Sequence, residues 1–287
     1  MTLPAKPRRV ADGSCDAHLH VYHRAKSPEG PVPADADAAA YAALRSCFGL
    51  SRAVVVQPRP YGTDNSIVLA SIATLGRSST RGIAVLHPDV SERELQALHE
   101  AGIRGVRFSL FTQRNAVVTF DMVEPLARRV SPLGWHLQLH WTASQIVEHQ
   151  ALLRRLPVPV VFDHMARLPV DAGTRHPAFA VVASLLREGR AWVKLSGPYL
   201  ESRTGPEDDF GDIDPIAKAF IACAPDRLVW GSDWPQSDWR GIAADEALRR
   251  LLKVLARWAG TDEMIRKLMV VNPAALYGFD QSDVKVK

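Results

Sequence analysis

The sequence predicts an α/β barrel of eight parallel strands, and three observations support this prediction. Short runs rich in β-branched residues alternate with stretches of amphipathic, helical periodicity along nearly the whole chain. Runs such as 158–162 are almost continuously apolar, which is typical of parallel strands covered on both faces. Eight strand–helix units in about 260 residues match a (β/α)8 TIM barrel. We therefore expect residues 1–287 to form a single domain of this fold.

The apolar runs and the periodic stretches between them define the expected elements. The predicted strands cover residues 14–20, 53–57, 82–86, 105–109, 136–140, 158–163, 191–195 and 228–233. The predicted helices cover residues 34–48, 66–75, 92–100, 122–130, 144–153, 177–187, 215–222, 242–258 and 262–269, and a short one begins at Pro273. The proline-rich segment 23–34 is expected to be a loop over the mouth of the barrel.

Residues with known preferences for helix ends support these limits. Ser91 and Glu94 have the spacing of a capping box, and Asn272 is expected to cap the helix that begins at Pro273. Glycines are expected to end four of the helices. These residues are Gly76, Gly102, Gly134 and Gly189.

The composition is that of an ordinary globular protein and excludes several classes of function. The formal net charge is only +4 and the arginine pairs are scattered, so we do not expect nucleic-acid binding. No apolar run approaches the ~18 residues of a membrane span, and residues 1–10 lack the apolar core of a secretory signal. The modest basic excess suits a small anionic substrate.

Cysteine content indicates the compartment. Three cysteines, a small and odd number, suit reduced thiols in a cytoplasm. Cys15 is expected to be a free, buried strand residue. The sequence does not decide the oligomeric state, so a homo-oligomer stays open.

Titratable side chains gather at the predicted carboxyl ends of the strands, where a barrel of this type carries its active site. They are His18, His20, Arg107, His140, His164 and Asp233. Because side chains alternate along a strand, His18 and His20 should point the same way. Two imidazoles near a carboxylate suit a metal ion or acid–base chemistry. The chain is therefore expected to be an enzyme.

Eight motifs follow one another along the chain. They are DAHLH (16–20), VVQPRPYGTDN (55–65), GIRGVRF (102–108), GWHLQLH (134–140), VFDHMAR (161–167), WVKLSGPY (192–199), WGSDWP (230–235) and NPAALYGF (272–279). In this order they resemble the amidohydrolase superfamily, in the branch of TIM-barrel hydrolases that includes 2-pyrone-4,6-dicarboxylate lactonases. The resemblance covers essentially the whole chain.

The resemblance implies a role for each matching residue. Asp233 would be the general base that takes a proton from the attacking water. The substrate carbonyl would be surrounded by His18, His20 and His164. Substrate carboxylates would be bound by Arg107, Arg114, Arg167 and Arg203, because a planar guanidinium suits a carboxylate. Further substrate contacts are expected from Tyr61, Thr63 and His140.

Two cofactor states stay open. Relatives that use zinc place a histidine at the position of His140, so one divalent metal, zinc or manganese, would be held by His18, His20, His140 and Asp233. Without a metal, the histidines would contact the substrate carbonyl directly and Asp233 would act alone on water. A binuclear site is not expected, because the fourth strand ends in Arg107 and Phe108, with no lysine to bridge two metals.

The expected reaction is hydrolysis of a carboxylate-bearing lactone, either of the 2-pyrone-4,6-dicarboxylate kind or derived from a sugar acid. Asp233 would activate the water while the histidine cluster polarises the carbonyl. Two other reactions would use the same residues: isomerisation of a lactone of the D-galactarolactone type, and zinc-dependent decarboxylation. A barrel that binds an anion without turning it over is the non-enzymatic alternative.

Several candidate residues also have a purely structural explanation. Asp16 is better explained as an anchor or an orienting group than as a reacting one. Arg107 could pair with Asp233 or another acid, and Arg203 with the acids of its own loop. Segment 62–65 could be only the cap of the following helix. His140 could be a packed residue beside Trp141.

Overall fold

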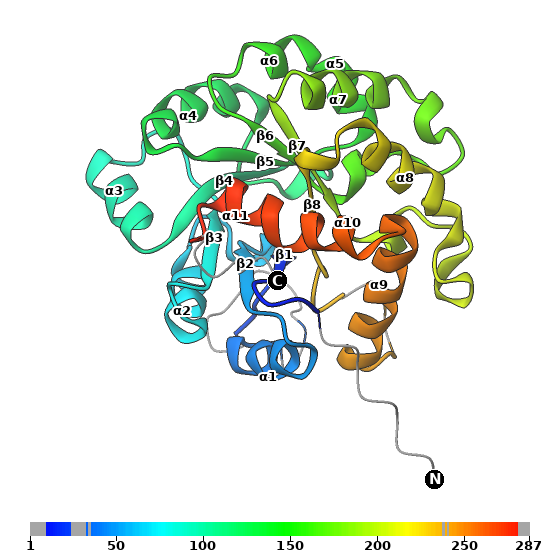
Figure 1. The fold of residues 1–287 in the computed structure, drawn as a ribbon. Helices are drawn as coiled ribbons and strands as arrows, with labels where there is room; N and C mark the ends of the chain where they lie inside the picture. The colour runs from blue at the N-terminus through cyan, green and yellow to red at the C-terminus, as the bar shows by residue number, and fades with distance from the viewer. Residues whose placement is uncertain (1–9, 24–32, 34–35, 237–238, 240, 281–287) are drawn as a thin grey trace.

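The predicted barrel is confirmed by the structure, a computed structural model that describes residues 10–23, 33, 36–236, 239 and 241–280. One sheet holds eight parallel strands in the order β1 to β8, with helices around its outside (Figure 1). The strands are β1 (Cys15–Leu19), β2 (Arg52–Val56), β3 (Thr80–Ala84), β4 (Ile103–Ser109), β5 (His136–His140), β6 (Val160–Phe162), β7 (Ala191–Leu195) and β8 (Leu228–Trp230). The predicted lid segment 23–34 lies almost wholly outside the described residues.

The helices bury apolar stripes against the sheet, as α9 does with Leu248, Leu251 and Leu255. They are α1 (Ala38–Phe48), α2 (Ser66–Leu75), α3 (Glu92–Glu100), α4 (Val123–Val130), α5 (Ala143–Glu148), α6 (Gln150–Arg155), α7 (Pro177–Arg187), α8 (Asp214–Cys223), α9 (Ala244–Ala259), α10 (Asp262–Arg266) and α11 (Asn272–Tyr277). The single helix predicted over 144–153 is instead two helices, α5 and α6, which meet at His149.

Of the predicted helix caps, the one at Ser91 is present and the one at Asn272 is not. The Ser91 hydroxyl accepts a hydrogen bond from the Glu94 N–H at 3.2 Å, which confirms the cap of α3. The prediction for Asn272 is wrong, because a π-helical turn over Lys267–Val271 joins α10 to α11 and leaves no helix start to cap. The Asn272 amide instead donates to the carbonyl oxygens of Pro225 and Leu228, at 2.8 and 2.7 Å, and ties α11 to the start of β8.

The end of the barrel at which the strands begin is closed by α11 and the residues after it. Tyr277 and Phe279 pack into a buried apolar cluster with Cys15 and Val229. The Arg81 guanidinium donates to the carbonyl oxygens of Tyr277 and Gly278. Cys15 is buried and unpaired, as expected. In the described part of the chain, no helix is long and apolar enough to cross a membrane.

The barrel closes between β1 and the residues that follow β8. The predicted eighth strand, 228–233, ends early at Trp230, and Asp233 has a left-handed φ of 56°. The closing contacts are two backbone hydrogen bonds of 2.8 Å, from the Asp233 N–H to the His18 carbonyl and from the His20 N–H to the Trp234 carbonyl. Asp233 therefore lies beside the two histidines because of these hydrogen bonds rather than because of strand alternation.

Asp16 is the side-chain anchor of this seam. Its buried carboxylate accepts hydrogen bonds from the Ser232 N–H at 2.8 Å, the Ser232 hydroxyl at 2.5 Å and the Tyr41 hydroxyl at 3.0 Å. Oxygens bonded in this way are held away from the cavity. The structural explanation of Asp16 as an anchor is confirmed.

The seam leaves no room for a side chain at Gly231. A Cβ there would lie 2.5 Å from the His18 Cβ and 2.7 Å from the His18 nitrogen. We expect Gly231→Ala to lower the free energy of unfolding by about 1–3 kcal/mol, because β1 must move away from β8. Urea denaturation followed by tryptophan fluorescence measures this change.

The matched control is Gly260→Ala, which adds a methyl group in open space at a left-handed φ of 72°. It should cost about 1–2 kcal/mol through its backbone alone and leave turnover unchanged. An unchanged free energy of unfolding in Gly231→Ala would contradict the tight seam.

Candidate active site

A cavity of about 550 Å³ opens at the end of the barrel where the strands finish. Six of the predicted site residues line it: His20, Arg107, His140, His164, Arg167 and Asp233. His18 lies beneath them and is fully buried. The parallel strands thus bring residues from across the chain to one edge, as expected for this fold.

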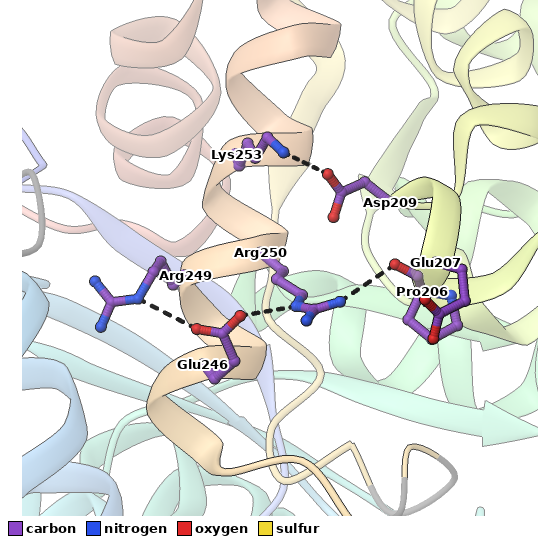
Figure 2. A pocket seen from close by; sticks show the side chains of 7 residues that line it. All are labelled: Pro206, Glu207, Asp209, Glu246, Arg249, Arg250 and Lys253. Atoms are coloured by element: carbon purple, nitrogen blue, oxygen red, sulfur yellow. Dashed lines mark hydrogen bonds and ion pairs between the residues drawn. The ribbon is translucent and has the colours of Figure 1, made fainter. Parts of the chain in front are cut away.

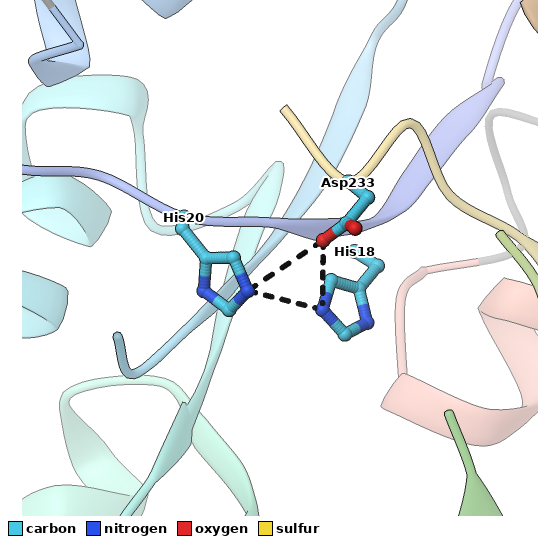
Figure 3. Close-up of side chains that lie close together, drawn as sticks. All are labelled: His18, His20 and Asp233. Carbon is cyan, nitrogen blue, oxygen red and sulfur yellow. Dashed lines mark hydrogen bonds and ion pairs between the residues drawn. The ribbon is translucent and has the colours of Figure 1, made fainter. Parts of the chain in front are cut away.

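Three of the predicted residues meet at one point (Figure 3). His18 Nε2 is 3.3 Å from His20 Nε2 and 3.5 Å from Asp233 Oδ1. His20 Nε2 is 3.6 Å from the same Asp233 oxygen. The other oxygen of this carboxylate, Oδ2, accepts a 2.5 Å hydrogen bond from the Tyr199 hydroxyl. Asp233 therefore directs one oxygen at the histidine pair while Tyr199 holds the other.

The hydrogen-bond partners fix the tautomer of His20 but allow both tautomers of His18. His20 Nδ1 is 2.8 Å from the Val56 carbonyl, which only accepts, so neutral His20 directs a bare Nε2 at the cluster. His18 Nδ1 lies 3.3 Å from the Lys194 ammonium and 3.3 Å from Asp163 Oδ1. Both tautomers of His18 therefore have a partner, a donor for bare Nδ1 and an acceptor for protonated Nδ1.

The donor set fits a single metal ion. Asp163 Oδ1 is buried and accepts no hydrogen bond within the described residues, so a proton on His18 Nδ1 would satisfy it. His18 Nε2, His20 Nε2 and Asp233 Oδ1 then turn three lone pairs to one point. The three atoms lie 3.3, 3.5 and 3.6 Å from one another, close enough for one ion to bind all three.

A buried layer of charge supports the cluster from below. Asp163 Oδ2 accepts hydrogen bonds from the Arg107 guanidinium at 3.1 and 3.2 Å and from the Gln138 amide at 3.1 Å. Lys194 is fully buried and donates to the Gln138 side chain at 2.6 Å and to the Ala17 carbonyl at 2.8 Å. These polar groups occupy a part of the barrel that is usually filled by branched apolar side chains.

Burial and neighbouring charges set the protonation states. Burial, and then the charge of Arg107, lowers the pKa of His20 to about 3. Burial raises the pKa of Asp233 to about 7, although the hydrogen bond from Tyr199 opposes this shift. Burial opposes ionisation of Asp163 too, but His18, Arg107 and Lys194 together hold the pKa of that carboxyl well below its usual range. The cluster thus combines neutral histidines with a carboxyl group that titrates near neutrality.

His140 lies in the cavity wall but outside the cluster. Its Nδ1 is 3.1 Å from the Ser109 hydroxyl and its Nε2 is 3.2 Å from the Arg167 guanidinium, so both ring nitrogens already have partners. The ring also stacks on Phe111, with 5.1 Å between centroids. The structure brings together three of the four predicted metal ligands and leaves His140 beside Arg167.

His164 and Arg167 reach the cavity through an unusual turn. The four residues His164–Arg167 have left-handed φ values between 49° and 59°, although none is glycine. Such a conformation costs roughly 1–2 kcal/mol per residue. It places the His164 ring 4.8 Å from the ring of His18, and the Arg167 guanidinium 4.0 Å from the ring centroid of Phe111. Strain of this kind is typical of functional sites.

Four predicted substrate contacts do not line the cavity. Thr63 and Arg114 are exposed, and Arg203 forms a surface ion pair with Asp171 rather than with the acids of its own loop. The Tyr61 hydroxyl is hydrogen-bonded to the backbone N–H and carbonyl of His23. The interpretation of segment 62–65 as a cap is supported by Asp64, which accepts from the Ser66 N–H at 3.0 Å.

Other residues at the site had no distinguishing signal in the sequence. The missed residues are Arg59, Phe111, Asp163, Lys194 and Tyr199. Lys194 lies within β7, and a lysine in a strand is ordinarily expected to face the solvent. Only Asp163 carried a hint, because it stands directly before His164 at a strand end.

A second cavity, of about 410 Å³, lies on the outside of the barrel beside α9 (Figure 2). Most of its charged side chains pair with one another. Arg250 binds Glu246 at 2.8 Å, and Lys253 binds Asp209 at 2.6 Å. With its charges matched at the surface, this cavity resembles a solvated ion-pair network more than a binding site.

The charge layer generates a prediction for Asp163. We expect Asp163→Asn to lower the free energy of unfolding by about 3–5 kcal/mol, because Arg107 and Lys194 would remain buried without their anion. The exposed Glu188, which pairs with Arg154, is the control, and Glu188→Gln should cost less than about 1 kcal/mol. Urea denaturation compares the two variants. Equal, small losses would show that the layer does not depend on the Asp163 charge.

Comparisons with known proteins agree with this geometry. The family model described as Amidohydrolase matches residues 15–279. The chain is 34% identical to a 2-pyrone-4,6-dicarboxylate hydrolase of Comamonas testosteroni, covering 96% of this chain and 93% of the relative. It is 31% identical to a 4-sulfomuconolactone hydrolase of Hydrogenophaga intermedia, covering 93% and 89%.

The structure is also similar to a solved one. That protein is a probable 2-pyrone-4,6-dicarboxylic acid hydrolase of Acinetobacter baumannii with citric acid bound. The TM-score is 0.79 at 26% identity, and the match covers 93% of this chain and all of the other. Its strand-end motifs resemble the same superfamily. The protein therefore belongs to the amidohydrolase family.

Proposed function

We propose that this protein is a hydrolase that opens a lactone carrying carboxylate groups. The observation that carries the proposal is the Asp233 carboxylate, directed at two neutral histidines within a cavity lined by three arginines. Two relatives are named as lactone hydrolases, and the solved relative holds citric acid, a tricarboxylate. These names agree with an arginine-lined cavity that accepts small carboxylated molecules.

Asp233 supplies the base. Its carboxylate takes a proton from a water molecule, whose oxygen attacks the carbonyl carbon of the lactone. The ring C–O bond then breaks, and Asp233 returns the proton to the departing oxygen, giving the open-chain acid. Tyr199 keeps the carboxylate in place by its hydrogen bond to Oδ2 throughout these steps.

The oxyanion needs donors that His20 does not provide. Neutral His20 presents a lone pair at Nε2 and its low pKa opposes protonation, so it binds a cation rather than an oxyanion. Arg107 and His164 line the same cavity and are the candidate donors. Arg167, whose charge is matched by Glu201 at 2.7 Å, is a candidate for holding a substrate carboxylate.

We infer that one divalent metal ion completes the site. His18, His20 and Asp233 would hold it, with His140 left as a neighbour of Arg167. When bound, such an ion polarises a carbonyl and lowers the pKa of a bound water. Asp163 supports this arrangement by accepting the Nδ1 proton of His18 in the metal-binding tautomer.

Hydrolysis in oxygen-18 water tests the proposed reaction. A panel of carboxylated lactones, including 2-pyrone-4,6-dicarboxylate, is incubated with the protein and the products are analysed by mass spectrometry. We expect one solvent oxygen in each ring-opened product. A rearranged lactone without the label would indicate an isomerase, and release of carbon dioxide would indicate a decarboxylase.

The role of Asp233 predicts the behaviour of its amide variant. Asp233→Asn should lower kcat by about 10²-fold or more, since a positioned base contributes about that much. Asp171→Asn, at an exposed carboxylate outside the cavity, is the control and should keep full activity. If Asp233→Asn retains its activity while its melting temperature is normal, another group is the base.

The raised pKa of Asp233 predicts a pH profile that depends on metal. In chelated protein, kcat/KM should fall below pH about 7, because protonated Asp233 cannot act as a base. Added zinc should move this fall to lower pH, since a nearby cation favours the carboxylate. Where chelated protein is too slow to assay, the carbon-13 shift of the Asp233 carboxyl reports the same titration. A titration near pH 4 without metal would contradict the assignment.

A further inference from the structure

The ammonium group of Lys194 has three acceptors beneath the cluster. The side chain is fully buried, and an ion pair with Asp163 at 3.9 Å balances its charge. An ammonium carries three protons. Two of them are donated to the Gln138 amide oxygen at 2.6 Å and to the Ala17 carbonyl at 2.8 Å. The acceptor for the third is His18 Nδ1, at 3.3 Å.

The Gln138 amide holds the ammonium in this direction. Its nitrogen donates to Asp163 Oδ2 at 3.1 Å, so its oxygen is the atom that faces Lys194. Gln138 is itself fully buried in β5. Lys194 therefore cannot turn away from His18 without breaking a buried hydrogen bond.

Asp163 offers His18 Nδ1 the opposite kind of partner. Its Oδ1 lies 3.3 Å from this nitrogen, yet in the described part of the chain that oxygen takes part in no hydrogen bond. The contact between Lys194 and His18 Nδ1 does have hydrogen-bond geometry. An ammonium only donates, so the Nδ1 that accepts from it is bare and the single proton of neutral His18 lies on Nε2.

The other side of the His18 ring suits the same tautomer. Nε2 lies 3.3 Å from the bare Nε2 of His20 and 3.5 Å from Asp233 Oδ1, so a proton there has two acceptors. A metal ion, however, needs a lone pair on the nitrogen that binds it. The tautomer that fits Lys194 is thus the one that cannot bind a metal through Nε2.

We propose that Lys194 is a positioning residue that keeps His18 Nδ1 free of a proton in the metal-free protein, and that it thereby weakens metal binding at Nε2. When an ion binds, the proton leaves Nε2 and a proton occupies Nδ1, so the ring stays neutral and no net proton is released. The hydrogen bond from Lys194 is lost, and Asp163 becomes the acceptor. The inference rests on the proposed function only for the role of His18 as a metal ligand.

Nitrogen-15 NMR of the chelated, full-length protein at pH 7 measures the position of the proton. Protonated and bare ring nitrogens have clearly separate chemical shifts. In the wild type we expect His18 Nδ1 to be bare. In Lys194→Met, which removes the donor, Nδ1 should become protonated, because Asp163 is then its remaining partner. If this variant does not fold, the wild-type spectrum decides the inference by itself.

Zinc affinity gives a second, independent readout. The dissociation constant is measured at pH 7 by competition with a chromophoric chelator. Lys194→Met should bind zinc about tenfold more tightly or better, since binding no longer breaks a hydrogen bond from a charged donor. The matched control is Lys218→Met, which removes an exposed lysine that pairs with Asp214 at 3.2 Å. It should change zinc affinity by less than about twofold and leave the His18 spectrum unchanged.

Three results would overturn the inference: a protonated His18 Nδ1 in the chelated wild type, a bare one in Lys194→Met, or a changed spectrum without tighter zinc binding. Tighter zinc binding with an unchanged spectrum would show that only the lost charge acts. Zinc binding by neither protein would reject the metal ion of the proposed function and with it the effect on affinity, while the NMR result still decides the role of Lys194. Neither measurement requires turnover, so failure to open a lactone in oxygen-18 water is a separate result.

Discussion

The closure of the barrel between β1 and the residues after β8 is the constraint on which the site depends. Two backbone hydrogen bonds join His18 and His20 to Asp233 and Trp234, and Asp16 holds the Ser232 backbone next to them. The same bonds that complete the sheet therefore set the distances within the His18–His20–Asp233 cluster. Stability and the geometry of the cluster share these contacts, so a change that loosens the seam affects both.

Electrostatic compensation is the second organising feature. Arg107 and Lys194 lie buried beneath the cluster, and Asp163 balances them at a cost in desolvation that a purely apolar core would avoid. What the network provides is a choice of hydrogen-bond partners for His18 Nδ1. The protein can thus present either a lone pair or a proton at Nε2, and the former suits a cation.

The cavity above the cluster combines matched and unmatched charges. Arg167 is held between Glu201 and His140, which fixes its direction, whereas Arg59 has no acidic partner among the residues that the structure describes. A fixed, compensated arginine orients a ligand with little net attraction, and an uncompensated one adds attraction for anions.

The sequence by itself determined the barrel and six of the residues that line the cavity at its mouth. Apolar runs of strand length and helix-end residues such as Ser91 depend on local preferences, so they can be read without the fold. Parallel strands then bring their carboxyl ends to one edge, which is why His20, His164 and Asp233 could be expected to meet. The motifs predicted which residues share this edge, but not which groups each side chain contacts.

Only the tertiary structure decided those partners. The sequence left His140 open between a metal ligand, a substrate contact and a packed residue, and in the structure Ser109 and Arg167 lie at its two ring nitrogens. Arg59 lies in the quoted motif 55–65 but was given no role, since its place in the cavity depends on the turn after β2. The left-handed turn at 164–167 contains no glycine, the residue from which such a turn could have been predicted. Such features follow from which strands become neighbours, and that information is spread over the whole chain rather than held in any local segment.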